Sequence, residues 1–365
     1  MPKIACVMMQ KDEVFLLRPW LAYHGHLFGF ENLFVLDNGS TSPNVRDTLM
    51  DYAKLGVKVD WGHGSRQDYL AKGDLIGGWM RILDARREYD FLIPLDCDEF
   101  VVLRTEQEFS CSREQIHRYL DGLVGEQRIL CFPYQLANHP LNPDIYHRYA
   151  FFKVFFAAGT ASPIDHGHHL AKDRAGMEAT DTRLIHLHFH HKVFDLKSTQ
   201  ARQSWVGTID VDNPVELAAY SGPSAHLNRF FLEEKDQYYR SFLDMVHFYL
   251  PQFRALLSDL GAPLNLPTEA VAPGLEMRVT ELDAVATSEA NGVVVIVPMA
   301  RAADTAPAEF RATRFHEGHY LGANPDLVAA GVDPTVHFCI HGVKEGRPLR
   351  RDANAPPRQP PEQQA

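Results

Sequence analysis

Two aspartates stand one residue apart at the end of an apolar run. Residues 92–98 read Leu-Ile-Pro-Leu-Asp-Cys-Asp, so the run stops at Asp96 and Asp98. Such a run is typical of a buried strand, and open α/β sheets bind ligands where their strands end. Paired carboxylates are hard oxygen ligands that suit Mg²⁺ or Mn²⁺, and such an ion would hold a phosphorylated ligand. The alternative is that both acids cap the next helix. Cys97 between them is expected to point into the core.

The elements that would position these acids alternate between strand and helix. The sequence predicts strands over 4–9, 33–36, 57–61 and 91–95, with helices over 16–27, 45–55 and 67–87, the last interrupted at Gly77-Gly78. This alternation is typical of a parallel sheet with helices on both faces. Polar or turn-forming residues follow three of these strands, among them the run 37–41. Because parallel strands end at one edge, these side chains are expected to line a binding cleft.

The pattern loosens beyond residue 100. Further strands are expected over 128–133, 149–156 and 186–194, and an aromatic-rich helical stretch over 227–260 that breaks at Pro251. The predicted organisation is an α/β domain (1–200), a helical extension (201–261), a proline-rich linker (262–273), a small C-terminal module (274–351) and a disordered tail (352–365).

Composition excludes several classes of protein. The 365 residues carry a formal net charge of −11 and no densely basic stretch, so a nucleic-acid partner is not expected. The longest strongly apolar run, Val293–Val297, is too short to cross a bilayer. The five cysteines are scattered, with neither a disulfide framework nor a CxxC zinc motif, and the N-terminus lacks a signal-peptide pattern. We therefore expect a cytoplasmic protein, and the sequence leaves its oligomeric state open.

The order of several motifs resembles that of the GT-A glycosyltransferases of family 2, especially the bacterial group related to family 92. The resemblance covers roughly residues 1–200, and the motifs lie at 11–13, 20–24, 29–30, 37–41 and 96–100. It implies a GT-A (Rossmann-like), mostly parallel sheet flanked by helices. It also implies the transfer of a sugar from a nucleotide-sugar, in the first place a UDP-sugar, to a hydroxyl of a glycan or similar polar acceptor.

The same resemblance implies roles for individual residues. Asp96 and Asp98 match the DxD motif, whose Mn²⁺ or Mg²⁺ ion bridges the two phosphates of the donor. His188 is expected at the metal or the diphosphate, and Lys192 at the phosphates. Contacts with the nucleotide-sugar are expected from Asp12, Glu13, Asp37, Asn38, Gln67 and Asp96.

The acceptor hydroxyl of an inverting enzyme would need a carboxylate base. Asp165, in the polar loop 163–169, is a candidate, although a solvated loop acid is the plainer interpretation. Histidines crowd residues 166–191, so a zinc hydrolase stays an alternative. A metal-dependent nucleotidyltransferase would place a glycine-rich basic loop where the chain has residues 10–13. A non-catalytic glycan- or nucleotide-binding protein on the same fold is the remaining alternative.

Overall fold

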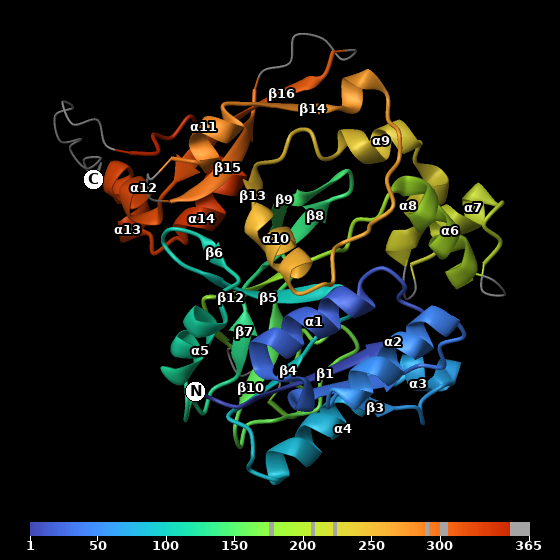
Figure 1. Ribbon diagram of the computed structural model, residues 1–365. Coiled ribbons are helices and arrows are strands. Elements are labelled where there is room, and N and C mark those ends of the chain that lie inside the picture. Colours follow the sequence, from blue (N-terminus) through green and yellow to red (C-terminus); the bar gives the residue numbers. More distant parts are fainter. Residues whose placement is uncertain (175–178, 206–208, 222–224, 289–291, 300–305, 351–365) are drawn as a thin grey trace. The chain divides into compact units, whose positions relative to one another are not determined.

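The computed structural model describes residues 1–174, 179–205, 209–221, 225–288, 292–299 and 306–350 (Figure 1). The contacts divide the chain into two compact units, each assembled from separate segments. Unit 1 contains residues 1–138, 148–190 and 250–266, and unit 2 contains the described parts of 139–147, 191–249 and 267–365. The domain boundaries expected from the sequence stay predictions, and the tail expected over 352–365 lies outside the described residues.

Unit 1 is built on a seven-stranded sheet of order β11-β7-β10-β4-β1-β2-β3 (Figure 1). Its strands are β1 (Ile4–Gln10), β2 (Leu33–Asp37), β3 (Lys58–Asp60), β4 (Phe91–Pro94), β7 (Leu130–Phe132), β10 (Lys153–Ala157) and β11 (Thr180–Asp181). β4, β1, β2 and β3 run parallel to one another, whereas β10 is antiparallel to both β4 and β7. The predicted α/β class, with a mostly parallel sheet, is therefore confirmed.

Helices cover this sheet because its strands are apolar on both sides. All seven residues of β1 are buried, and Ala5, Val7 and Met9 join the core under helix α4. Helix α1 contacts β1 and β2 and buries Trp20 and Tyr23. The helices of unit 1 are α1 (Leu17–Phe28), α2 (Pro43–Lys54), α3 (Arg66–Leu70), α4 (Lys72–Ala85), α5 (Arg113–Asp121) and α10 (Pro251–Asp259), with 3₁₀ turns η1 (Phe30–Asn32) and η2 (Lys172–Arg174).

A second set of strands in unit 1 follows the order β8-β12-β5-β6. These strands are β8 (Gln135–His139), β12 (Leu184–His188), β5 (Glu99–Arg104) and β6 (Phe109–Ser110). β12 is antiparallel to β5 and parallel to β8, which sets His188 opposite Glu99 and opposite Ala137. The register of this pairing brings the end of β12 beside the residues that follow β4.

Helix α4 runs without a break through Gly77-Gly78, so the interruption predicted there is wrong. The glycines of α4 instead permit a close approach to a loop. A Cβ on Gly73 would lie 2.5 Å from the carbonyl oxygen of Asp165, and one on Gly77 would lie 3.0 Å from the Cα of Pro163. Gly73 and Gly77 are four residues apart and so share a helix face, against which the backbone of the loop packs.

We expect Gly73→Ala to destabilise the protein although alanine favours helices. The new methyl group would collide with backbone atoms that cannot rotate away, and overpacking of this kind costs about 1–3 kcal/mol. Gly78→Ala is the matched control, because a Cβ on Gly78 would meet no atom within 4 Å, and it should stabilise the helix by about 0.5–1 kcal/mol. Urea unfolding of both variants measures the difference, and equal midpoints would contradict the packing argument.

Unit 2 contains an antiparallel group of strands with one parallel edge. Its strand order is β14-β16-β15-β13-β9, and only β14 is parallel to its neighbour β16. These strands are β9 (Asn142–Tyr149), which extends into unit 1, β13 (His247–Tyr249), β14 (Met277–Thr280), β15 (Val293–Pro298) and β16 (Ala308–Phe315). The prediction that 227–260 is helical apart from a break at Pro251 is wrong at β13, because pairing with β9 and β15 overrides the local pattern.

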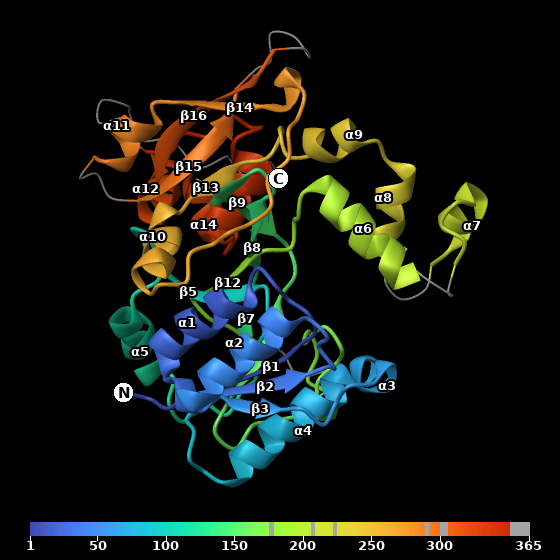
Figure 2. The same cartoon turned by 45° about the vertical axis from the view of Figure 1, so that its right-hand side comes forward.

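The helices of unit 2 are short. They are α6 (Phe194–Trp205), α7 (Pro214–Ala219), α8 (Arg229–Leu232), α9 (Lys235–Arg240), α11 (Leu282–Ala286), α12 (Glu317–Ala323), α13 (Pro325–Ala329) and α14 (Pro334–His337), with 3₁₀ turns η3 (Ala225–Asn228) and η4 (Pro273–Leu275) and a π-helical turn η5 (Phe338–Gly342). α6 and α8 lie side by side (Figure 2) and share an aromatic core that includes Phe194, Phe230 and Tyr238.

Buried histidines form part of the core of unit 2. The rings of His139 and His247 lie 5.7 Å apart, those of His147 and His247 lie 6.1 Å apart, and Phe242 packs on His139 and His147. Burial lowers the pKa of His139 from 6.5 to about 3 and that of His147 to about 4, and places that of His247 well below its usual range. These imidazoles are therefore neutral in the folded protein.

We expect unit 2 to lose stability in mild acid. In the unfolded chain these histidines bind protons below pH 6.5, whereas the folded chain resists protonation, so the free energy of unfolding falls as the pH drops from 6.5 toward 4. Each such histidine contributes a slope of about 1.4 kcal/mol per pH unit in this window. Urea unfolding at pH 7.5, 6 and 5 measures it. His147→Gln should reduce the slope and the exposed control His341→Gln should not; a pH-independent midpoint would contradict the assignment.

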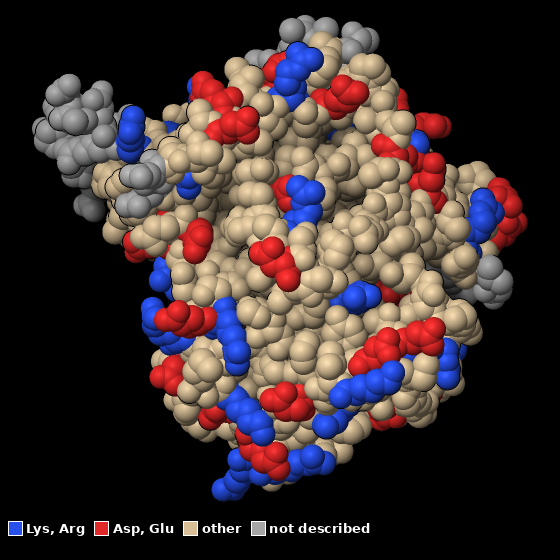
Figure 3. Space-filling model, viewed as in Figure 1, with Lys and Arg blue, Asp and Glu red and all other residues tan. Residues whose placement is uncertain are grey.

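None of the described helices is long and apolar enough to cross a membrane. Basic and acidic side chains are interspersed on the face of the molecule shown in Figure 3. All five cysteines lie within the described residues, and none of them forms a disulfide.

Candidate functional site

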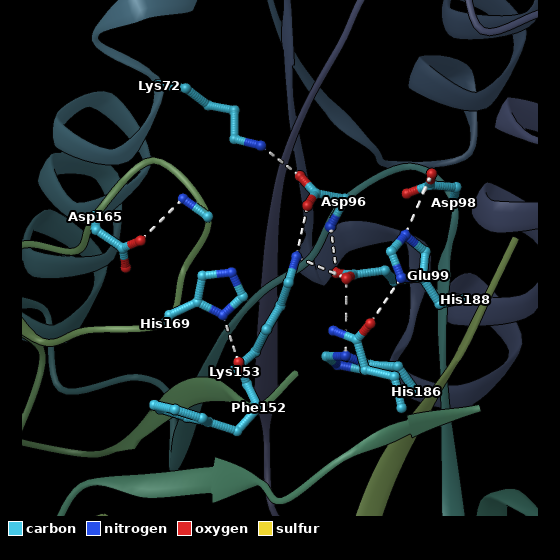
Figure 4. Close-up of polar contacts among 12 residues, drawn as sticks. Lys72, Asp96, Asp98, Glu99, Phe152, Lys153, Asp165, His169, His186 and His188 are labelled. Carbon is cyan, nitrogen blue, oxygen red and sulfur yellow. Dashed lines mark hydrogen bonds and ion pairs between the residues drawn. The ribbon is translucent and has the colours of Figure 1, made fainter. Parts of the chain in front are cut away.

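The candidate site begins where β4 ends. Leu95 continues the parallel pairing by donating its N–H to the carbonyl of Val7 (3.1 Å), and the chain then turns at Asp96. Glu99 closes this turn, because its carboxylate accepts the N–H of Asp96 (2.9 Å) while its own N–H donates to the carbonyl of Asp96 (3.1 Å). Cys97 is buried, as predicted, and Asp98 is partly exposed beside β12 (Figure 4).

Two lysines hold the carboxylate of Asp96. The ammonium of Lys72 lies 2.6 Å from Oδ1 of Asp96, and that of Lys153 lies 2.5 Å from Oδ2 (Figure 4). Lys153 is also 2.6 Å from the fully buried carboxylate of Glu99. Burial alone would raise the pKa of Asp96, but Lys153 and Lys72 hold it well below its usual range. Burial would likewise lower the pKa of Lys153, yet Asp96 and Glu99 raise it. Asp96 and Lys153 therefore stay charged.

Asp98 faces His188 across the end of β12. Nε2 of His188 lies 3.5 Å from Oδ2 of Asp98, and Nδ1 lies 2.7 Å from the side-chain oxygen of Gln135 on β8 (Figure 4). Since that amide oxygen can only accept, Nδ1 carries the proton and Nε2 is left to point toward Asp98. Burial would lower the pKa of His188, but the Asp98 carboxylate raises it above its usual value. Gln135 thus fixes the orientation of His188, as partners of metal-binding histidines commonly do.

The donor set at Asp98 fits a divalent cation in part. A carboxylate oxygen and an imidazole nitrogen that face each other can ligate Mn²⁺ or Mg²⁺ when the cation displaces the proton from Nε2, with phosphate oxygens or water completing the shell. Asp96 fits less well, because both of its oxygens are engaged by lysines. Among the described residues, no group of three or more His, Cys, Asp or Glu side chains is arranged to hold a metal.

Three other histidines of this region, His169, His186 and His190, pack against aromatic rings. His186 is fully buried with its ring 3.8 Å from that of Phe132, and burial places its pKa well below the usual range. The ring of His190 stacks on Tyr149 at 5.4 Å. The ring of His169 lies near Phe152, and its Nδ1 is 2.5 Å from the Phe152 carbonyl (Figure 4). His188, in contrast, faces Asp98, an acid that the sequence predicted for the site.

The loops after β1, β2 and β3 are tied together, as expected for strand ends that meet at one edge. Asp37 is buried and accepts hydrogen bonds from Gln10 Nε2 (2.5 Å) and from Ser40 Oγ (2.5 Å) and N (2.9 Å). Asn38 donates to the carbonyls of His63 (2.6 Å) and Ser65 (2.9 Å). In this state the side chains of Asp37 and Asn38 brace the loops, and contact with a nucleoside stays a prediction.

Three further predicted residues lie on or beside these loops. Asp12 has a left-handed backbone (φ 50°) and accepts the N–H groups of Thr41 and Ser42, both at 2.8 Å, at the start of α2. Glu13 is partly exposed next to it and accepts the N–H of Phe15 (3.3 Å). Gln67 is exposed on α3. Their roles toward a nucleotide remain predictions.

Asp165 and Lys192 complete the predicted set. Both carboxylate oxygens of Asp165 accept backbone N–H groups, from Leu170 at 2.6 Å and from Gly167 at 3.1 Å. These bonds shape the loop that carries Asp165 (Figure 4), and its role as a catalytic base stays a prediction. Lys192 belongs to unit 2, where its carbonyl accepts the hydroxyl of Tyr238 (2.8 Å), and its role at the phosphates stays a prediction.

Sequence reasoning missed Lys72, Lys153 and Gln135. Lys72 lies 24 residues before its partner Asp96, and Lys153 lies 57 residues after it. Gln135 lies 53 residues before its partner His188. No local pattern marks them, because only the packing of α4, β10 and β8 brings them to the site.

No family model matches the chain, and no curated protein matches it. Among the solved structures, the chain is similar to glucosyl-3-phosphoglycerate synthase from Mycobacterium tuberculosis in complex with Mn²⁺, UDP and glucosyl-3-phosphoglycerate, with 16% identity and a TM-score of 0.31 over 57% of this chain and 81% of that one. S. aureus TarS is 11% identical with a TM-score of 0.28, over 66% of this chain and 43% of that one. A cytidylyltransferase from Leptospira borgpetersenii is 18% identical with a TM-score of 0.24, over 38% of this chain and 58% of that one. The chain thus spans less than two thirds of the last two. Because all three TM-scores are below 0.5, these similarities carry no argument about function, and a proposal has to rest on the residues of the site.

Proposed function

We propose that the protein is a metal-dependent glycosyltransferase that moves a sugar from a nucleotide-sugar to a hydroxyl of a glycan-type acceptor. The donor that we propose is a UDP-sugar. The observation that carries the proposal is the pair formed by Asp98 and His188. Gln135 orients the imidazole so that Nε2 faces the carboxylate, at the edge where the strands of a mostly parallel sheet end. Sheets of this kind bind nucleotides at that edge.

The chemistry that these residues would support is a displacement at the anomeric carbon. The acceptor oxygen forms a bond to this carbon and releases its proton to a base or to solvent. The bond between the carbon and the β-phosphate oxygen breaks, and its electron pair stays on the diphosphate. Asp98 and His188 would hold Mn²⁺ or Mg²⁺, which offsets the charge of the leaving diphosphate. Asp12, Asp37 and Asn38 would keep the strand-end loops in the shape that receives the nucleoside.

Calorimetry with UDP-sugars, in the presence and absence of Mn²⁺, tests the proposal. We expect binding that depends on the ion and weakens when His188→Ala removes one proposed ligand. A screen of nucleotide-sugars by mass spectrometry would then identify the donor from the mass added to the acceptor or from hydrolysed sugar. A protein that binds no nucleotide-sugar under either condition would refute the function.

The alternatives predict different results. A nucleotidyltransferase should release pyrophosphate from a nucleoside triphosphate, but in the loop after β1 the carboxylate of Asp12 accepts the N–H groups of Thr41 and Ser42, and the loop lacks the glycine-rich basic sequence of a phosphate loop. A zinc hydrolase should retain stoichiometric zinc on elemental analysis. A non-catalytic binding protein should bind nucleotide-sugar with metal yet never release nucleoside diphosphate.

A further inference from the structure

Of the two lysines that pair with Asp96, Lys72 is the less firmly held. Lys153 is almost fully buried, with 5% of its side chain exposed, and binds both Asp96 and Glu99. The ammonium of Lys72 pairs with Asp96, whose other oxygen already has Lys153, and 11% of its side chain is exposed. Asp96 would therefore stay paired if Lys72 moved away, because Lys153 would remain in place.

The packing of helix α4 on a neighbouring loop places Lys72 beside Asp96. Lys72 is the first residue of α4, and the adjacent Gly73 lets the helix lie against the carbonyls of Ile164 and Asp165, with no room for a larger side chain. The hydrogen bonds that Asp165 accepts from Gly167 and Leu170 hold the loop in that shape. The base of the Lys72 side chain is thus fixed, while its long flexible stem leaves the ammonium able to reorient.

The charges around Lys72 would allow it to pair with an anionic ligand. Lys72, Lys153, Asp96 and Glu99 form a neutral set of two cations and two anions. A nucleoside diphosphate adds negative charge beside this set, and its charge increases by one when the sugar departs. A lysine released from a carboxylate that keeps a second cation can neutralise that increase with little desolvation, since it is already inside the site.

We propose that Lys72 is a diphosphate-binding residue that moves from Asp96 to the β-phosphate of the donor. The proposal rests on the proposed function. During transfer the electron pair of the broken bond to the anomeric carbon stays on the β-phosphate oxygen, and Lys72 donates a charge-assisted hydrogen bond to that phosphate while keeping its own protons. The acceptor proton leaves to a base or to solvent and not to Lys72.

The test compares UDP with UMP, which lacks the β-phosphate, by calorimetry with Mg²⁺ present. Lys72→Met keeps the length of the stem and removes the charge. We expect the variant to bind UDP 10- to 100-fold more weakly than the wild type and UMP no more than about threefold more weakly, in line with loss of one charge-assisted bond. Lys72→Arg should recover at least part of the loss. Lys172→Met, which removes an exposed lysine paired with Asp74, is the matched control and should change neither affinity.

The outcomes separate this proposal from the proposed function. If the wild type binds neither nucleotide, the proposed function fails and the role of Lys72 with it. If the wild type binds UDP with metal but Lys72→Met weakens UDP and UMP equally, or weakens neither, the role of Lys72 is wrong while the function stands. A thermal melt of each variant shows whether it folds. Should Lys72→Met not fold, the same comparison on Lys72→Gln decides the proposal.

Discussion

Asp98→Asn should lower turnover by a factor on the order of 1,000 while the protein stays folded. The amide keeps the shape of the carboxylate but removes its charge and weakens it as a ligand for a divalent cation. The diphosphate would then leave with less of its charge compensated, which raises the barrier to transfer. Steady-state release of UDP from the donor measures the effect, and calorimetry should show that UDP binding no longer depends on Mn²⁺.

The matched control for this variant is Asp74→Asn, because Asp74 lies on α4 with 66% of its side chain exposed. It should retain the turnover of the wild type. The melting temperature of Asp98→Asn should stay close to that of the wild type, since the side chain of Asp98 is partly exposed and the amide keeps its shape. Near-normal turnover of a folded Asp98→Asn protein would remove the basis of the proposed function.

Lys153→Met should destabilise unit 1 by about 3–5 kcal/mol. The substitution leaves the carboxylate of Glu99, which has no exposed surface, without the ammonium that lies 2.6 Å from it. It also deprives Asp96 of one of its two cations. An uncompensated carboxylate in the interior is far more costly than the loss of the pair as a whole. Urea unfolding at pH 7 measures the change in the free energy of unfolding.

A second variant isolates the cause of this loss. Lys153→Met combined with Glu99→Leu removes both buried charges and leaves Asp96 paired with Lys72, so it should recover part of the stability. Lys54→Met, at an exposed pair with Asp51, should leave the unfolding midpoint unchanged. If the double variant is less stable than Lys153→Met alone, hydrogen bonds of Glu99, and not its charge, are what the site depends on.

The sequence predicted the parallel part of unit 1 well because the relevant signals are local. β1, β2 and β4 are short apolar runs followed by polar residues, and four neighbouring parallel strands end at one edge as expected. β13 could not be predicted in this way. Its residues His247–Tyr249 lie in an aromatic-rich stretch, and only pairing with β9 and β15 makes them a strand.

The contacts within the site were also beyond what the sequence could predict. The position of Asp96 at the end of β4 followed from the sequence, but its lysine partners did not, because they come from α4 and β10. Asp37 was expected to contact a nucleoside, which stays a prediction, but the three internal hydrogen bonds that its carboxylate accepts could not be predicted from the sequence. Residue types can therefore indicate where a site lies, whereas the partner of each charge is decided by packing.

The interleaving of the two units bears on synthesis by the ribosome. Unit 1 is completed only by residues 250–266, where Phe253 of α10 packs on Tyr23 (5.2 Å between ring centroids) and on Phe100 (5.0 Å). A nascent chain must therefore emerge well past the first two hundred residues before the aromatic packing around Tyr23 and Phe100 is complete. Truncation near residue 200 would yield a fragment in which part of this aromatic surface is uncovered.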